Sequence, residues 1–141
     1  MRVSEVMTRD PVVIRPSETI RRAAQMMDEY NIGAIPVCDG QRLVGMVTDR
    51  DITIRATAAG RNPDETPVSE AMSGDLRTCW LDDDVEEAAR VMSEVQIRRL
   101  PVIDGDRRLV GVVALGDLAT DRAGDVAGAL GAISEPSAPD R

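Results

Sequence analysis

The stretch Gly45-Met46-Val47-Thr48-Asp49-Arg50-Asp51 decides the fold that this chain is expected to adopt. Small and apolar residues end a strand there, and the pattern then predicts a helix over residues 50–59. Thr48 and Asp51 meet at the turn, where the first backbone N–H groups of a helix lack partners and attract anions. The frame returns as Gly111-Val112-Val113-Ala114-Leu115-Gly116-Asp117, in which alanine replaces the threonine.

The first 120 residues or so contain an internal repeat with an offset of 65 residues, which becomes 66 after a hairpin turn. Val3-Ser4-Glu5-Val6-Met7 returns as Val68-Ser69-Glu70-Ala71-Met72, and Ile35-Pro36-Val37 returns as Leu100-Pro101-Val102. Each repeat predicts the order strand, helix, strand, strand, helix, which gives an α/β (α+β) fold. Neither repeat buries much surface alone, so the two are expected to pack sheet against sheet with pseudo-two-fold symmetry.

The expected boundaries follow from the repeat. Residues 1–60 form the first repeat, 61–67 a linker, 68–120 the second repeat and 121–141 a flexible tail. Within the tail, residues 125–133 are expected to form a short helix and residues 134–141 to be disordered.

Periodicity places the elements inside each repeat. Residues 12–14 are expected to form a strand, Ser17 the N-cap of the next helix, and Asn31 its end. Asp39-Gly40 predicts a tight hairpin turn. Asp82 is the expected N-cap in the second repeat. The two predicted buried helix faces comprise Ile20, Ala23, Ala24 and Met27, and Val85, Ala88, Ala89, Met92 and Val95.

Composition narrows the function classes. A net charge of −8 and a pI of about 4.5 disfavour nucleic acids and anionic membranes as partners. The polar first residues and the lack of a long apolar run lead us to expect a cytoplasmic protein. With no histidine and no C-x-x-C pair, neither a metal site nor an enzyme is expected. Cys38 and Cys79 are expected to be core residues, and their pairing stays open.

These features together resemble the CBS-domain family. The sequence is similar to a tandem CBS pair, or Bateman module, in repeat length, element order and three motifs. The motifs are the opening Val-x-x-x-Met, the apolar-Pro-Val strand at Pro36 and Pro101, and Gly-apolar-apolar-Thr/Ser-x-x-Asp at residues 45–51. The resemblance covers about residues 1–120, and the first repeat also resembles stand-alone bacterial CBS proteins of the hypoxic-response type.

The resemblance implies an adenosine-binding cleft between the repeats. Asp51 would accept hydrogen bonds from the ribose hydroxyls, Thr48 would donate to a phosphate or ribose oxygen, and Val47 would line the adenine. Arginines would bind phosphate. The implied residues are Val47, Thr48, Arg50, Asp51, Met72, Arg77, Ile97, Arg98 and Arg99.

A second implied cleft departs from the family pattern. Ala114 lacks the hydroxyl, and Asp10 stands where the first cleft has Arg77, so weaker binding of anionic nucleotides is expected. The implied residues are Met7, Asp10, Val12, Ile32, Gly33, Val113 and Asp117.

The function implied is a regulatory module that senses an adenosine-containing nucleotide and transmits its binding by conformational change in a homodimer. AMP, ADP, ATP, S-adenosylmethionine and NAD share the adenosine, so the sequence does not choose among them. No cofactor is required, and a protein effector stays open. The alternative is a structural or protein-interaction module that has lost its ligand.

Two residue-level alternatives also stay open. Thr48-x-x-Asp51 is an ordinary capping box, although the persistence of Asp117 beside Ala114 favours a further role for the acid. Strand alternation is expected to place Arg98 on the core side, where it would need either a carboxylate or a ligand phosphate. The acidic residues 82–84, 86 and 87 are expected to be the charge pattern of a helix N-terminus.

Overall fold

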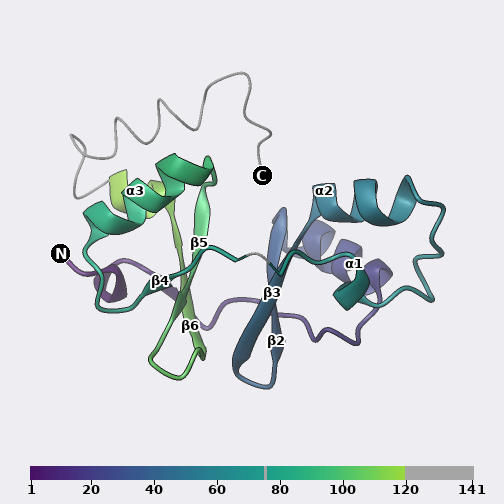
Figure 1. Ribbon diagram of the computed structural model, residues 1–141, viewed down its shortest axis with the longest axis horizontal. Helices are drawn as coiled ribbons and strands as arrows, with labels where there is room; N and C mark the ends of the chain where they lie inside the picture. Colours follow the sequence, from purple (N-terminus) through teal and green to yellow (C-terminus); the bar gives the residue numbers. More distant parts are fainter. Residues whose placement is uncertain (75, 120–141) are drawn as a thin grey trace. The chain divides into compact units, whose positions relative to one another are not determined.

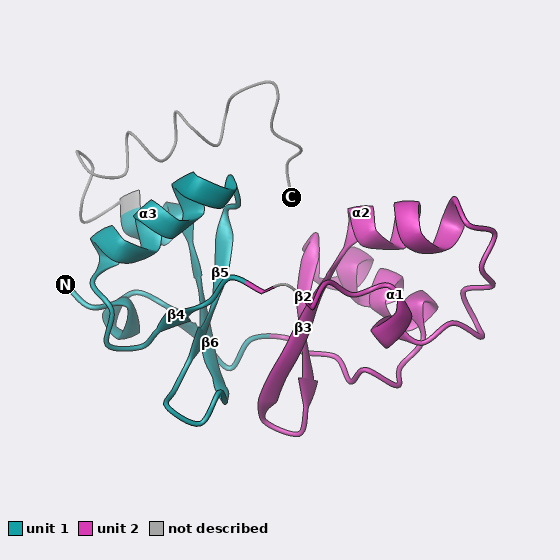
Figure 2. Ribbon diagram, viewed as in Figure 1, with its two compact units in different colours: residues 1–11, 77–140 teal, residues 12–76, 141 magenta. Residues whose placement is uncertain are grey.

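The computed structural model describes residues 1–74 and 76–119, which form two compact units (Figures 1 and 2). Unit 1 comprises Met1–Pro11 and the described residues from 77 to 119, and unit 2 comprises Val12–Leu76. The expectations for the tail, residues 121–141, lie outside the described residues.

Unit 2 is built around an antiparallel hairpin that packs against helices. Its strands are β2 (Ala34–Asp39) and β3 (Arg42–Thr48). Isolated bridges extend this hairpin on both sides, Ile14 to Val37 in parallel and Ser73 to Met46 in antiparallel. The helices are α1 (Ile20–Tyr30), α2 (Asp49–Asp51), the π-helix η2 (Ile52–Thr57) that continues α2, and the 3-10 helix η3 (Val68–Glu70).

Unit 1 repeats this plan with a four-stranded sheet in the order β1-β6-β5-β4 (Figure 1). The strands are β1 (Thr8–Arg9), β4 (Cys79–Trp80), β5 (Arg99–Ile103) and β6 (Leu109–Ala114). The helices are the 3-10 helix η1 (Val3–Glu5), α3 (Val85–Val95) and α4 (Leu115–Ala119). The mixed helices and strands confirm the predicted α+β class.

The leading segment of each repeat packs in the unit that the other repeat builds (Figure 2). In unit 1, Val3 is fully buried, and its N–H donates to the carbonyl of Asp83 at 2.8 Å. In unit 2, Val68 is fully buried, and its N–H donates to the carbonyl of Glu18 at 2.7 Å. Unit 2 is therefore one continuous stretch of chain inserted into unit 1.

Each unit has its own hydrophobic core, and most predicted helix positions point into it. Met27, Ala88 and Met92 are buried as predicted, because they recur on one helical face. Ala24 is exposed instead, since Met26 fills the neighbouring buried position. The larger buried side chains are Val3, Val85, Met92, Leu100, Val102, Val113 and Leu118 in unit 1, and Ile14, Ile20, Ile35, Val37, Leu43, Val47 and Val68 in unit 2.

Both long helices begin later than predicted. Thr19 rather than Ser17 is the N-cap of α1, and its hydroxyl accepts the N–H of Arg22 at 3.1 Å. Asp84 rather than Asp82 precedes α3. The cause is the packed leading segment, because carbonyl groups just before each helix accept hydrogen bonds from it. These carbonyls belong to Pro16 and Glu18 in unit 2 and to Leu81 and Asp83 in unit 1.

Four further local features were predicted, and each of them falls within the described residues. The strand predicted at residues 12–14 is reduced to the bridge at Ile14, whose N–H and C=O both bond to β2. The helix after β3 begins at Asp49 rather than at residue 50, and its π-helical part ends at Thr57. The hairpin turn at Gly40 and the left-handed helix end at Asn31 are confirmed, with φ of 63° and 52°.

Candidate functional site

The turn at the end of β3 is a reciprocal capping box. The hydroxyl oxygen of Thr48 accepts the N–H of Asp51 at 3.0 Å, and Oδ2 of Asp51 accepts the N–H of Thr48 at 3.0 Å. Both residues are half-buried. The hydroxyl hydrogen of Thr48 can still be donated, and Oδ1 of Asp51 bonds to no other described residue. The turn therefore fixes one donor and one acceptor side by side.

The equivalent turn in unit 1 keeps only half of this arrangement. Oδ2 of Asp117 accepts the N–H of Ala114 at 2.9 Å, and Asp117 makes a further interaction. The backbone bond to Asp117 needs no hydroxyl at Ala114, so the further role favoured for this acid stays a prediction. Local structure is therefore sufficient to account for the acid, and the two turns differ in the hydroxyl of Thr48 and in the charged residues Asp49 and Arg50, which Leu115 and Gly116 replace.

A methionine packs against the middle of the central strand in each unit. A Cβ added at Gly45 of β3 would lie 2.6 Å from the sulfur of Met72, and one added at Gly111 of β6 would lie 2.7 Å from the sulfur of Met7. Only glycine leaves room for these sulfur atoms. The structure therefore brings Met72 onto the strand that ends in Thr48, and Met7 onto the strand that ends in Ala114.

Arg55 in η2 makes a contact beside the capping box that the sequence did not predict. Its Nη1 donates to the carbonyl oxygen of Met72 at 3.0 Å, which ties the helix after the capping box to the segment that crosses Gly45. No local sequence signal identifies this contact, because it joins residues 17 positions apart through a π-helical turn. Asp49 was also missed, and its N–H donates to the carbonyl of Gly33 at 3.0 Å.

The predicted arginines lie on the surface of the two units. Arg50 is exposed on α2 of unit 2, and Arg77 is exposed just before β4 of unit 1. Arg98 and Arg99 are both exposed, so the prediction that Arg98 faces the core was wrong. The carbonyl of Arg98 accepts the N–H of Leu115 at 2.8 Å, which continues the pairing of β5 with β6 one residue before β5 begins at Arg99.

The remaining predicted residues divide into core and surface positions. Val47 and Val113 are fully buried in the cores of units 2 and 1. Val12, Ile32 and Gly33 are half-buried in unit 2, Ile97 is half-buried in unit 1, and Asp10 is exposed. Unit 2 thus holds Val47, Thr48, Arg50, Asp51 and Met72 of the first implied cleft, and unit 1 holds Arg77, Ile97, Arg98 and Arg99. That these residues share one site stays a prediction.

Comparison with known proteins identifies the family. The family described as "CBS domain" matches residues 3–56 and 68–124. The chain belongs to the CBS-domain family. Among curated CBS proteins it is 47% identical over 120 residues to YhcV of Bacillus subtilis, covering 85% of this chain and 84% of that protein. It is also 40% identical over 116 residues to hypoxic response protein 1 of Mycobacterium tuberculosis, covering 82% of this chain and 80% of the relative.

Solved CBS structures share the fold. Hypoxic response protein I, crystallised with two coordinated zinc ions, has a TM-score of 0.79 and 38% identity, over 86% of this chain and 98% of that one. CBSX2 in complex with AMP has a TM-score of 0.74 and 26% identity, over 86% and 96%. A CBS pair in complex with 5-methylthioadenosine and S-adenosyl-L-methionine has a TM-score of 0.73 and 28% identity, over 88% and 97%.

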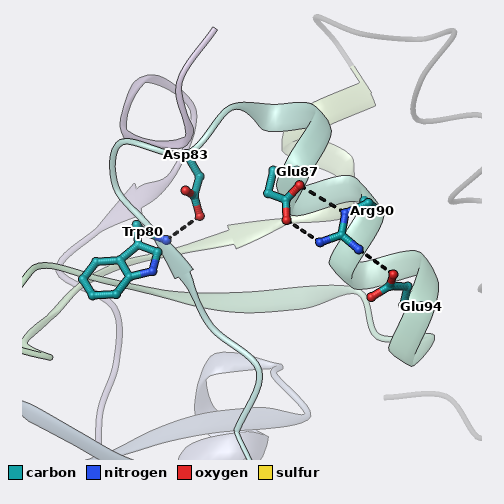
Figure 3. Close-up of polar contacts among 5 residues, drawn as sticks. All are labelled: Trp80, Asp83, Glu87, Arg90 and Glu94. Atoms are coloured by element: carbon teal, nitrogen blue, oxygen red, sulfur yellow. Dashed lines mark hydrogen bonds and ion pairs between the residues drawn. The ribbon is translucent and has the colours of Figure 1, made fainter.

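The acidic residues before and in α3 of the second CBS repeat are used locally (Figure 3). Oδ2 of Asp83 accepts the N–H of Trp80 at 2.9 Å, and Arg90 bridges Glu87 and Glu94 along the exposed face of α3. The hydrogen bond from Arg90 holds the pKa of Glu87 below its usual value. Among residues 1–74 and 76–119 there is no group of three His, Cys, Asp or Glu side chains that could hold a metal ion.

Both cysteines of the CBS pair are buried free thiols, as expected for core residues. Burial raises the pKa of Cys38 to about 11. Burial, and next the negative charge of Asp83, raise the pKa of Cys79 to about 12. Neither thiol is therefore set up as a nucleophile at neutral pH. No helix in the described part of the chain is long and apolar enough to cross a membrane.

Proposed function

We propose that this CBS pair is a regulatory module that binds an adenosine-containing nucleotide of the AMP, ADP or ATP class. The observation that supports this proposal most directly is the Thr48–Asp51 capping box, in which the hydroxyl hydrogen of Thr48 and the Oδ1 atom of Asp51 take no part in the two mutual hydrogen bonds. The solved complexes of two CBS proteins with AMP and with 5-methylthioadenosine and S-adenosyl-L-methionine support adenosine as the shared part of the ligand.

The chemistry of the turn favours ribose over phosphate as the group next to Asp51. Adjacent ribose hydroxyls donate hydrogen bonds, which a carboxylate accepts, whereas phosphate oxygens would be repelled by the same charge. Thr48 can donate to a phosphate or ribose oxygen. The positive charge for phosphate would come from Arg50 of unit 2 and from Arg77, Arg98 and Arg99 of unit 1, all of which are exposed.

Regulation requires that the ligand has unequal affinity for two arrangements of the repeats. In the proposal the nucleotide contacts both repeats of a homodimer in the cytoplasm and shifts their arrangement, which a protein effector reads. The module is not an enzyme. The turn with Ala114 binds anionic nucleotides more weakly, because it lacks the hydroxyl donor.

The test is thermal unfolding with AMP, ADP, ATP, S-adenosylmethionine and NAD, for wild type, Asp51→Asn and Asp117→Asn. Asparagine keeps one oxygen that accepts the capping N–H but replaces the second with a donor, so the turn is preserved while ribose contact is lost. A ligand at about a hundred times its Kd should stabilise the fold by roughly 2.7 kcal/mol, or several degrees.

The expected result is a ligand-dependent shift that Asp51→Asn abolishes and Asp117→Asn preserves. No shift with any of the five ligands would reject the proposal and favour the structural or protein-interaction module. A shift that both variants retain would place the ligand away from these turns.

A further inference from the structure

The N-terminal segment, residues 1–9, belongs to unit 1 but is connected to it only through noncovalent contacts. The chain leaves this segment at Asp10 and passes through all of unit 2 before it returns to unit 1 at Arg77. The equivalent segment of unit 2, around η3, lies within one continuous stretch of that unit. The two leading segments therefore differ in how easily they could leave their unit and be replaced.

The contacts of the N-terminal segment form a specific docking surface on unit 1. Val3 is fully buried in the core, and β1 pairs with β6 so that Thr8 lies opposite Val112. The N–H of Ser4 donates to the carbonyl of Leu81 at 3.1 Å. The sulfur of Met7 occupies the space over Gly111. The same segment from a second copy of the chain could make all of these contacts, because on the segment's side they involve only residues 1–9.

The hinge that holds the segment in place has an unfavourable backbone. Four described non-glycine residues have positive φ, and three of them end a helix or form a hairpin turn, namely Asn31, Gln96 and Arg107. The fourth is Asp10, with φ of 50°, at the junction between the segment and unit 2. Pro11 follows it, and a residue before proline favours an extended backbone. Short strained hinges promote exchange of segments between copies.

We propose that residues 1–9 exchange between two copies of the chain, so that β1 of each copy pairs with β6 of the other. The monomer, in which the segment packs on its own chain, and the exchanged dimer have the same contacts except at the hinge. Extension of Asp10 then removes the left-handed conformation, and this difference favours the exchanged dimer at high protein concentration. The proposal does not depend on nucleotide binding.

The experiment mixes two full-length single variants, Thr8→Cys and Val112→Cys, unfolds them together, refolds them at high concentration and oxidises them. Directly opposite residues on antiparallel strands have Cα atoms about 4.5–5.5 Å apart, which suits a disulfide. The two new thiols are on different chains, so exchange would raise the yield of the disulfide between them above that of a mixture whose thiols do not lie opposite each other. The control mixture replaces Val112→Cys by Arg108→Cys, which lies four residues earlier in the sequence, just before β6 begins at Leu109.

We expect at least tenfold more disulfide-linked heterodimer, identified by peptide mass spectrometry, than in the control mixture. The double variant Thr8→Cys/Val112→Cys on one chain checks that the pair can form a disulfide within a monomer. If it does so while the mixed single variants give only the control level, the proposal is overturned.

A third variant tests the hinge. Asp10→Gly, made in both partners, should lower the yield of heterodimer about fivefold, because glycine adopts positive φ without strain. That change corresponds to about 1 kcal/mol between the two forms. An unchanged yield would show that the hinge does not favour exchange and would overturn this part of the proposal.

Discussion

The two strand-to-helix turns, residues 48–51 and 114–117, differ at three of their four positions and yet keep the same acid and the same backbone hydrogen bond. Asp51 accepts the N–H of Thr48 at 3.0 Å, and Asp117 accepts that of Ala114 at 2.9 Å. The acid is thus part of the turn in both repeats. The comparison shows that a motif residue can be retained for local structure, so the hydroxyl and the surrounding charges carry the difference in proposed binding.

The largest difference in stability between equivalent substitutions is expected at Gly45 and Gly111, the glycines that lie under the two methionines. A Cβ at Gly111 would lie 2.8 Å from the carbonyl oxygen of Thr8, whereas one at Gly45 would lie 3.1 Å from that of Ser73. A methionine sulfur can move aside, but a paired strand carbonyl moves less. We expect Gly111→Ala to lower the free energy of unfolding by about 3 kcal/mol and Gly45→Ala by about 1 kcal/mol in urea titrations.

The control for this pair is Gly116→Ala, since in the described part of the chain a Cβ at Gly116 would have no atom within 4 Å beyond its chain neighbours and the backbone of its own helix. Alanine in that helix should leave stability unchanged or raise it. Equal losses at Gly45 and Gly111 would mean that the sulfur atoms, rather than the strand carbonyls, limit the space.

Each unit contains one buried thiol, where the other repeat has an isoleucine, and these thiols are expected to make the free energy of unfolding depend on alkaline pH. Since the pKa of Cys38 is raised to about 11 and that of Cys79 to about 12, their stabilising effect is complete below about pH 9 and is lost as pH rises through these values. The loss should be about 1 kcal/mol per thiol between pH 9 and pH 10. All 17 basic residues are arginines, so no lysine contributes.

Urea titrations at pH 8, 9 and 10 measure this effect. Cys38→Ala and Cys79→Ala should each remove about half of the decline. A decline that neither variant alters would assign it to other groups.

The smallest effect is expected from the substitution that restores the missing hydroxyl. Ala114→Ser should complete the capping box at β6 and raise the free energy of unfolding by about 0.5–1 kcal/mol, and Thr48→Ala should lower it by a similar amount. The midpoint of urea unfolding gives both values. A loss at Thr48 without a gain at Ala114 would contradict the view that the two turns share one geometry.

Periodic and turn signals predicted the parts of the fold that depend on nearby residues. The faces of α1 and α3, the hairpin at Gly40 and the helix end at Asn31 follow from spacing and from residues that tolerate a left-handed backbone. The capping box was likewise foreseeable, because Thr48 and Asp51 are three residues apart.

The predictions that were wrong depend on contacts between distant parts of the chain. Thr19 replaces Ser17 as N-cap because η3, some fifty residues later, binds the carbonyls of Pro16 and Glu18. The contact between Arg55 and Met72 needs a π-helical turn that no local pattern indicates. Arg98 is exposed where it precedes β5, and its carbonyl pairs with Leu115 just beyond the end of β6. Such outcomes follow from tertiary packing, which a periodic pattern does not contain.

The insertion of unit 2 within unit 1 also sets the order of events during synthesis on the ribosome. The continuous stretch Val12–Leu76 can fold as soon as it has emerged, whereas β1 must wait for β6, about a hundred residues later. At 5–20 residues per second this delay is roughly 5–20 s. The first partners of the segment around the buried Val3, the carbonyls of Leu81 and Asp83, are also made only after all of unit 2, so the nascent chain is most exposed to aggregation while its first half is already folded.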